Sequence, residues 1–215
     1  MAVNAVSKNA PYSTAIIKRK ITCQTEEAKN FLGIKLDRIS VALFTLDVIS
    51  RKRIARLNIS AKEHKAASKA LNKLFTDFEK ELQAETARLE TVMQAQGIEG
   101  LAEHNNPASQ DVSITTPELK RAVDLLQAFD KLIILVDTLW LMGIMETEVA
   151  NQFRRSKAGQ LKRLFGNVFN LSQAAKKSSF VKDDAETQAA IAAEESKLTP
   201  AEEPSAEEPQ ESAAA

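Results

Sequence analysis

The sequence has little of what disulfide, metal and nucleotide sites require. Its single cysteine, Cys23, excludes an internal disulfide and every zinc motif built from several cysteines. The two histidines, His64 and His104, are not at a spacing that suits zinc or a catalytic triad. With only 6 glycines among 215 residues, the chain has no phosphate-cradling glycine loop. We therefore expect no catalytic residue, no metal and no cofactor, and a protein that is not an enzyme.

Long apolar runs are absent as well. No apolar run reaches the ~18 residues that a membrane span requires. The first residues also lack the basic and then apolar pattern of a secretory signal. From these two absences we expect a cytoplasmic protein that does not bind a membrane.

The net charge of zero hides two segments of opposite sign. Residues 183–215 contain ten acids, one base and three of the six prolines. Because this composition buries too little apolar surface to offset its ordering entropy, we predict that residues 179–215 form a disordered acidic tail. Residues 1–182 carry 28 bases and 19 acids, which favours a polyanionic partner, nucleic acid before an anionic membrane surface. The tail either competes for that basic surface or keeps the protein soluble.

The stretch TAIIKRKITC, residues 14–23, is β-branched or cationic and contains neither glycine nor proline. A period of two predicts a strand with two different faces. One face carries Ala15, Ile17, Arg19, Ile21 and Cys23, and the other carries Thr14, Ile16, Lys18, Lys20 and Thr22. Such a strand fits either an edge strand that its lysines protect from aggregation, or half of a β-ribbon that reads the DNA major groove. These residues alone favour neither structure.

Capping signals and apolar periodicity predict helices along most of the remaining chain. Thr25, followed by two acids, starts a short helix that ends at Gly33, and Thr116 with Pro117 starts the most apolar helix, which we place at the centre of the core. The expected ranges are 25–33, 35–53, 60–97, 117–142 and 146 onward, with a break into two helices allowed at Gly159. The alternation of Val112 and Ile114 with Ser113 and Thr115 allows a brief second strand at residues 112–114. The acids Asp124, Asp130 and Asp137 are expected on a solvated or salt-bridged helix edge.

We therefore predict a mainly α fold (α+β), a helical bundle with a short N-terminal strand that forms a ribbon, with a ribbon-helix-helix-like arrangement as one option. Residues 1–11 form a flexible N-terminus, and residues 12–178 form a mainly helical domain for DNA binding and oligomerisation. The strand pairs either with its twin in a homodimer or with residues 112–114.

Four stretches resemble the AcaB-like proteins of bacterial conjugative plasmids and integrative conjugative elements. They are CQTEEAKNFLG, TVMQAQGI, ITTPELKRAVDLLQAFDKLIILVDTLWLMGIM and QLKRLFGNV, and the resemblance covers about residues 12–170. Its landmarks are Thr25, Ala28, Phe31, Leu32, Gly33, Pro117, Leu125, Leu126, Phe129, Asp130, Lys162 and Arg163. The resemblance implies a DNA-binding transcriptional regulator with a ribbon-type reader. The acidic tail is not part of the family pattern.

On this hypothesis the chain is a transcriptional regulator of a mobile element that binds double-stranded DNA as a homodimer. Lys18, Lys20 and Thr22 would face base edges. Arg19, Arg51, Lys52 and Arg53 would hold phosphates, although the last three also suit the negative end of a helix dipole. A second basic surface is expected at Arg154, Arg155, Lys157, Lys162 and Arg163. The alternative is a non-enzymatic interaction or assembly protein of the conjugation or DNA-processing machinery, whose basic faces bind an acidic protein.

Overall fold

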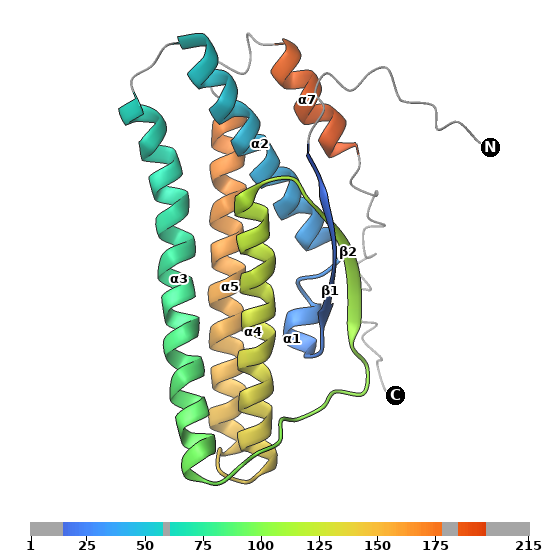
Figure 1. Ribbon diagram of the computed structural model, residues 1–215, viewed down its shortest axis with the longest axis vertical. Helices are drawn as coiled ribbons and strands as arrows, with labels where there is room; N and C mark the ends of the chain where they lie inside the picture. The colour runs from blue at the N-terminus through green and yellow to red at the C-terminus, as the bar shows by residue number, and fades with distance from the viewer. Residues whose placement is uncertain (1–14, 58–60, 178–184, 197–215) are drawn as a thin grey trace, which may run out of the picture.

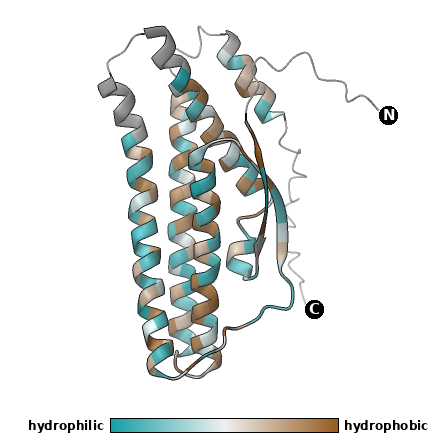
Figure 2. Cartoon of the chain, viewed as in Figure 1, coloured by the Kyte–Doolittle hydropathy of each residue, from teal (hydrophilic) through white to brown (hydrophobic). Residues whose placement is uncertain are grey.

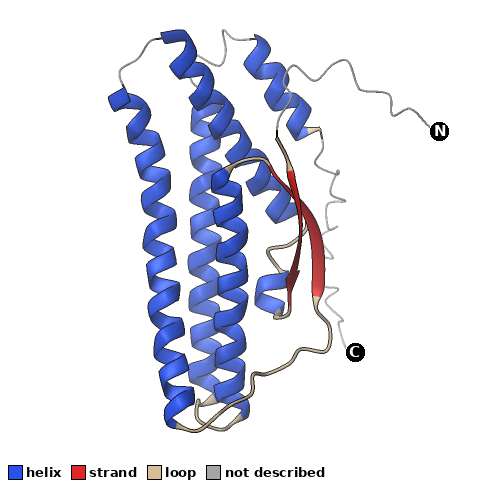
Figure 3. Ribbon diagram, in the orientation of Figure 1, coloured by secondary structure: helices blue, strands red, loops and turns tan. Residues whose placement is uncertain are grey.

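The computed structural model describes residues 15–57, 61–177 and 185–196. Its elements, in chain order, are β1 (Ile17–Cys23), α1 (Glu26–Lys29), α2 (Ile34–Leu57), α3 (Ala61–Ala95), β2 (Ala108–Ile114), α4 (Pro117–Leu141), α5 (Thr147–Lys176) and α7 (Ala185–Glu195). Helices α3, α4 and α5 run side by side along the molecule, α2 packs on α5, and the two strands lie along one side of this bundle (Figure 1). The prediction of a mainly helical fold with a short sheet is confirmed (Figure 3).

Helix α4 is the centre of the fold, as its apolar sequence predicts. Thr116 caps it by accepting a hydrogen bond from the Leu119 N–H at 3.1 Å, and Pro117 supplies the first turn. The helix contacts α1, α2, α3, α5 and both strands, so its apolar side chains are buried on several sides. Among them, Phe129 and Ile133 are completely buried.

The two strands form an antiparallel ribbon within one chain. The register runs from Ile17 opposite Ile114 to Cys23 opposite Ala108. Of the two pairings expected for the first strand, this is the pairing with the second segment, although that segment begins earlier than residue 112. The ribbon needs no second copy of the chain, and a ribbon-helix-helix arrangement is not confirmed.

Two expected features of the C-terminal half differ from the structure. Helix α5 continues through Gly159 without a break, because one glycine costs a helix only about 1 kcal/mol and the apolar side chains on both sides of it stay buried. Helix α7 lies inside the segment predicted to be disordered, and for these eleven residues the structure corrects that prediction.

The burial of Ile191 accounts for α7. Its side chain packs with Ile49 of α2 and Ala175 of α5, and Thr187 and Ala190 are buried as well. The alanines around it have the highest helix propensity, so a small contact suffices to hold this helix. The predicted flexible N-terminus, Ser60 at the start of the helix expected over 60–97, and the rest of the predicted acidic tail lie outside the described residues.

Candidate nucleic-acid interface

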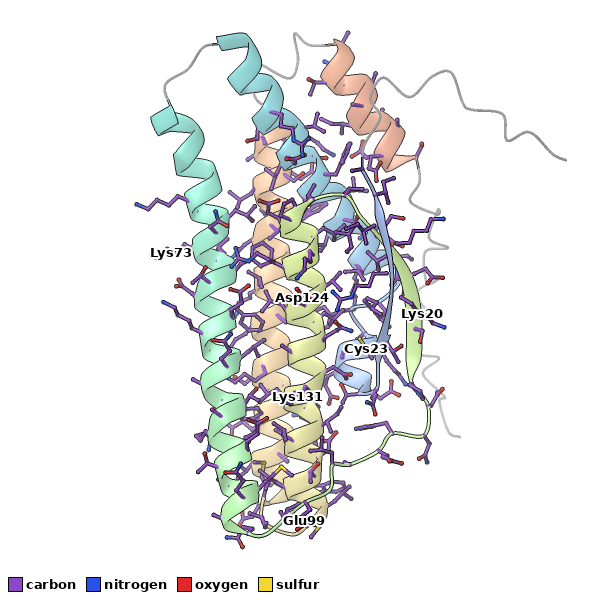
Figure 4. The ribbon with its side chains drawn as sticks, in the orientation of Figure 1. Lys20, Cys23, Lys73, Glu99, Asp124 and Lys131 are labelled. Carbon is purple, nitrogen blue, oxygen red and sulfur yellow. The ribbon has the colours of Figure 1, made fainter. Side chains whose placement is uncertain are left out.

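The ribbon turns its predicted DNA-reading face toward solvent. Lys18, Lys20 and Thr22 are exposed, whereas Ile21 and Cys23 between and beyond them are buried. Figure 4 shows Lys20 on the side of the ribbon that faces away from the helices. Strand β2 completes this face with three exposed residues, Ser109, Asp111 and Ser113. We call these six residues the outward face.

The two lysines of the outward face are available to an external partner. Asp111 lies opposite Lys20 in the register, yet neither lysine forms an ion pair with any residue that the structure describes. The Thr22 and Ser109 hydroxyls share a hydrogen bond of 2.9 Å across the strands. Two lysines, one aspartate and three hydroxyls give a polar face with a small positive charge, suited to phosphates and base edges.

Arg19 points to the opposite side of the ribbon. Its guanidinium donates to Asp124 Oδ1 of α4 at 2.6 Å and to the side chain of Gln127. Lys120 Nζ donates to the other oxygen of Asp124 at 2.5 Å. Burial opposes the charge of Asp124, but hydrogen bonds from Lys120 and Arg19 outweigh it and hold the pKa of the carboxyl below its ordinary value. The phosphate-binding role predicted for Arg19 does not fit this position.

A buried carboxylate holds the C-terminal end of β1. Asp130 of α4 accepts hydrogen bonds from the backbone N–H groups of Gln24 and Thr25, each at 2.9 Å, and from the Thr25 hydroxyl at 2.7 Å. Thr25 in turn caps α1 through the Ala28 N–H. Burial and the nearby Asp130 charge raise the pKa of the Cys23 thiol to about 12. Together with the contacts of Arg19, the hydrogen bonds to Asp130 fix the orientation of the outward face.

The other residues predicted to hold phosphates are Arg51, Lys52 and Arg53 near the end of α2. Arg51 is exposed but pairs with Asp47, one turn earlier on α2, at 2.9 Å. The side chains of Lys52 and Arg53 lie outside the described residues. Their predicted role therefore stays a prediction.

The second basic surface on α5 is only partly exposed. Arg154 pairs with Asp137 at 2.5 Å, and Lys157 is buried between α3 and α5, where it donates to Glu81 at 2.6 Å. These two cations stabilise the bundle. Arg155, Lys162 and Arg163 remain exposed, as the sequence led us to expect.

A groove of about 360 Å³ between α5 and the α1–α2 segment was missed from the sequence. Phenylalanines and Ile39 form its apolar wall, and three exposed cations, Lys35, Arg38 and Lys162, line it. The ammonium of Lys35 lies 5.7 Å from the centre of the Phe31 ring. The close spacing of Lys35 and Arg38 on one helix was the available signal, but their nearness to Lys162 depends on the packing of α2 against α5. The groove adds positive charge to this part of the domain.

Within residues 15–57, 61–177 and 185–196, no three side chains of His, Cys, Asp or Glu come together in a way that would hold a metal ion. Over the same ranges, none of the helices combines the length and apolar character that crossing a membrane demands.

A comparison with known protein families finds no match, and a comparison with curated proteins finds none either. Among solved structures, the crystal structure of selenomethionine-containing AcaB from uropathogenic E. coli is similar, with a TM-score of 0.73 and 22% sequence identity. The match covers 87% of this chain and 100% of AcaB. The chain has an AcaB-like fold. This agrees with the sequence resemblance, and at this identity the AcaB likeness concerns the fold alone.

Proposed function

We propose that the chain binds double-stranded DNA through the outward face of the ribbon and regulates transcription in a conjugative or integrative element. Lys18, Lys20 and Thr22 enter the major groove, which is wide enough for a two-stranded β-ribbon. We further propose that it works in the cytoplasm. It would bind as a homodimer, because one face with only two lysines is small and two copies give the contact area that a specific site needs.

One observation carries the proposal. Lys18 and Lys20 are exposed and unpaired among the described residues, while Arg19 between them is bonded to Asp124 and fastens the ribbon to α4. A strand that needed lysines only to prevent aggregation would not require its middle and its C-terminal end to be fixed in orientation. A rigid face with unpaired cations and hydroxyls is what base reading requires.

The test begins with an unbiased selection of DNA by the full chain from a random pool. Binding of the selected fragment is then measured by fluorescence anisotropy for the chain and for the variant Lys18→Ala/Lys20→Ala. Lys69→Ala/Lys73→Ala is the matched control, because it removes the same charge from exposed positions on α3. We expect the ribbon variant to lose discrimination between selected and scrambled DNA with its helical circular dichroism unchanged, and the control to keep it.

The salt dependence gives a second measurement. The four lysines that a dimer places in the groove also lie between the rows of phosphates, and if they neutralise four of these phosphates, log affinity falls linearly with log salt with a slope of about −3.6. Phosphate contacts from Arg51, Lys52 and Arg53 would make this slope steeper. A flat salt response, or equal binding by the ribbon variant and the chain, would refute the proposed interface.

The second candidate function is an assembly protein that binds an acidic protein. The pairing of β1 with β2 inside one chain favours it, because the ribbon does not depend on a dimer axis. Failure of the DNA selection, together with binding of polyglutamate that Lys18→Ala/Lys20→Ala removes, would support this candidate over the first.

A further inference from the structure

One end of the bundle exposes a concentration of large apolar side chains. Trp140, Leu141, Met142, Ile144 and Val149, at the turn from α4 to α5, are each between 39% and 64% exposed. They are half of the ten large apolar side chains that are exposed among the described residues, gathered within ten positions. Figure 2 shows the apolar colouring at this end of the bundle. Exposed apolar side chains that lie together in this way are typical of an interaction surface, whereas single exposed apolar residues are ordinary.

The turn that carries these side chains has a well-defined backbone. Gly143 has a φ of 72°, which favours glycine, and the Ile144 N–H donates to the Leu139 carbonyl at 2.9 Å to close the helix end. Trp140 donates its indole N–H to the Thr147 hydroxyl at 3.1 Å, and the Arg154 guanidinium lies 5.6 Å from the ring centre. The apolar side chains are therefore presented on a fixed frame.

The loop after α3 joins the same surface. The Ala102 N–H donates to the Thr138 hydroxyl at 2.9 Å, which places this loop against the last turns of α4, and Leu101 is 51% exposed. We call the exposed residues of this loop and of the turn the end surface; its apolar members are Leu101, Trp140, Leu141, Met142, Ile144 and Val149.

The charges of the end surface are all negative. Glu99, Glu103, Glu146 and Glu148 are exposed, and residues 94–104 and 138–152 contain no lysine or arginine. Figure 4 shows Glu99 at the tip of the bundle. The neighbouring cations are Arg154, which is paired with Asp137, and Arg155, farther along α5. The end surface thus has a sign opposite to that of the ribbon's outward face.

This combination selects one class of occupant. Four carboxylates repel nucleic acid and an anionic membrane. A second copy related by a two-fold axis would bring the same four carboxylates against each other, which is unfavourable. A helix with an apolar face flanked by lysines or arginines satisfies both the apolar side chains and the acids around them.

We propose that the end surface docks a cationic amphipathic helix of a partner protein. The apolar face of that helix covers Trp140 and Met142, and its basic flanks pair with Glu99, Glu103, Glu146 and Glu148. The inference does not depend on DNA binding by the ribbon, since the two surfaces share no residue.

The experiment uses Trp140, the only tryptophan of the chain, as a local reporter. The full chain is titrated with an amphipathic leucine/lysine peptide of about 18 residues that lacks aromatic side chains, and with the corresponding leucine/glutamate peptide. A local reporter is needed because the acidic residues after position 183 also attract a cationic peptide. We expect a saturable blue shift of the tryptophan emission with the lysine peptide and none with the glutamate peptide.

Two variants test the two parts of the surface. Glu99→Lys/Glu103→Lys changes exposed loop positions and should weaken lysine-peptide binding by about tenfold or more. Leu141→Ser/Met142→Ser should weaken it similarly through lost apolar contact. Asp77→Lys/Glu26→Lys is the matched control, because it reverses two exposed acids on α3 and α1, outside both surfaces, and should leave the titration midpoint unchanged.

Four outcomes would overturn the proposal: no blue shift, an equal shift with both peptides, an unchanged midpoint in the loop variant, or a shift with anionic vesicles. A blue shift that grows with protein concentration alone would also overturn it, since the occupant would then be a second copy. Unaltered circular dichroism of each variant excludes misfolding as the cause of lost binding.

Discussion

The guanidinium of Arg19 on β1 lies 2.6 Å from the carboxylate of Asp124 on α4, although the two residues are 105 positions apart in the chain. The same guanidinium also donates to Gln127, one turn further along α4. This contact ties the first strand to the central helix. It also explains how Lys18 and Lys20, on either side of Arg19, come to face the solvent.

We expect Arg19→Ala and Asp124→Ala each to lower the free energy of unfolding by about 1 kcal/mol, because both side chains are more than one third exposed and solvent screens the pair. Urea unfolding of the two single variants and the double variant measures the coupling. If the pair acts as described, the double variant loses less than the sum of the single losses. Full additivity would contradict a direct interaction.

Replacement of Asp130 by asparagine should be more costly. The buried carboxylate accepts three hydrogen bonds from residues 24 and 25, and an amide in its place directs N–H groups toward N–H donors. We expect Asp130→Asn to lower the free energy of unfolding by about 2–3 kcal/mol. Glu103→Gln, an exposed carboxyl in a loop, is the control and should be neutral. A loss below about 0.5 kcal/mol for Asp130→Asn would mean that the contact is not formed.

The thiol of Cys23 should be protected in the folded protein. It is completely buried, and its pKa is raised to about 12 by burial and the charge of Asp130, so almost no thiolate exists at pH 8. We expect Ellman's reagent to react slowly with the native chain, rapidly in urea, and faster with Arg19→Ala than with the unmodified chain. Rapid native labelling would show that the ribbon does not cover the thiol.

Acid should weaken the contact between α3 and α5. Burial raises the pKa of Glu81 and Glu85, but hydrogen bonds and charge outweigh it, mainly from Lys157 and Gln160 at Glu81 and from Arg88 and Lys157 at Glu85. Because both pKa values lie below the ordinary 4.5, this stability is present above about pH 4.5 and is lost as the pH falls through the lowered values. Urea midpoints measured from pH 6 to pH 3 should fall less steeply for Glu81→Gln than for the chain. Glu99→Gln should follow the chain.

Local signals made much of the backbone predictable. Thr25 and Thr116 cap helices where the sequence indicates, and Gly33 has the positive φ that its position after a short helix suggests. These features depend on residues within a few positions of one another, so a single sequence contains the information. The alternation around Lys20 likewise predicts which side chains are exposed.

Long-range partners were not predictable in the same way. The sequence around Arg19 does not indicate that its guanidinium will bind Asp124 and Gln127. Likewise, the sequence around Asp130 does not indicate which backbone N–H groups its carboxylate will bind. Helix α7 was missed because an alanine-rich acidic segment looks unstructured by composition, while its burial depends on contacts with Ile49 and Ala175, which are distant in the sequence. Likewise, the end surface combines a loop and a turn that only the packing of α4 brings together.

The register of the ribbon limits where the chain can be truncated without losing the outward face. Lys18 faces Ser113 across a chain segment that includes both α2 and α3. Closing a loop of this length costs conformational entropy that the strand pairing alone must offset, so we expect the two strands to pair only after the helices between them have packed. A synthetic peptide of residues 15–33, or a fusion that transplants it, would therefore not reproduce this surface, and any truncation before residue 115 would abolish it.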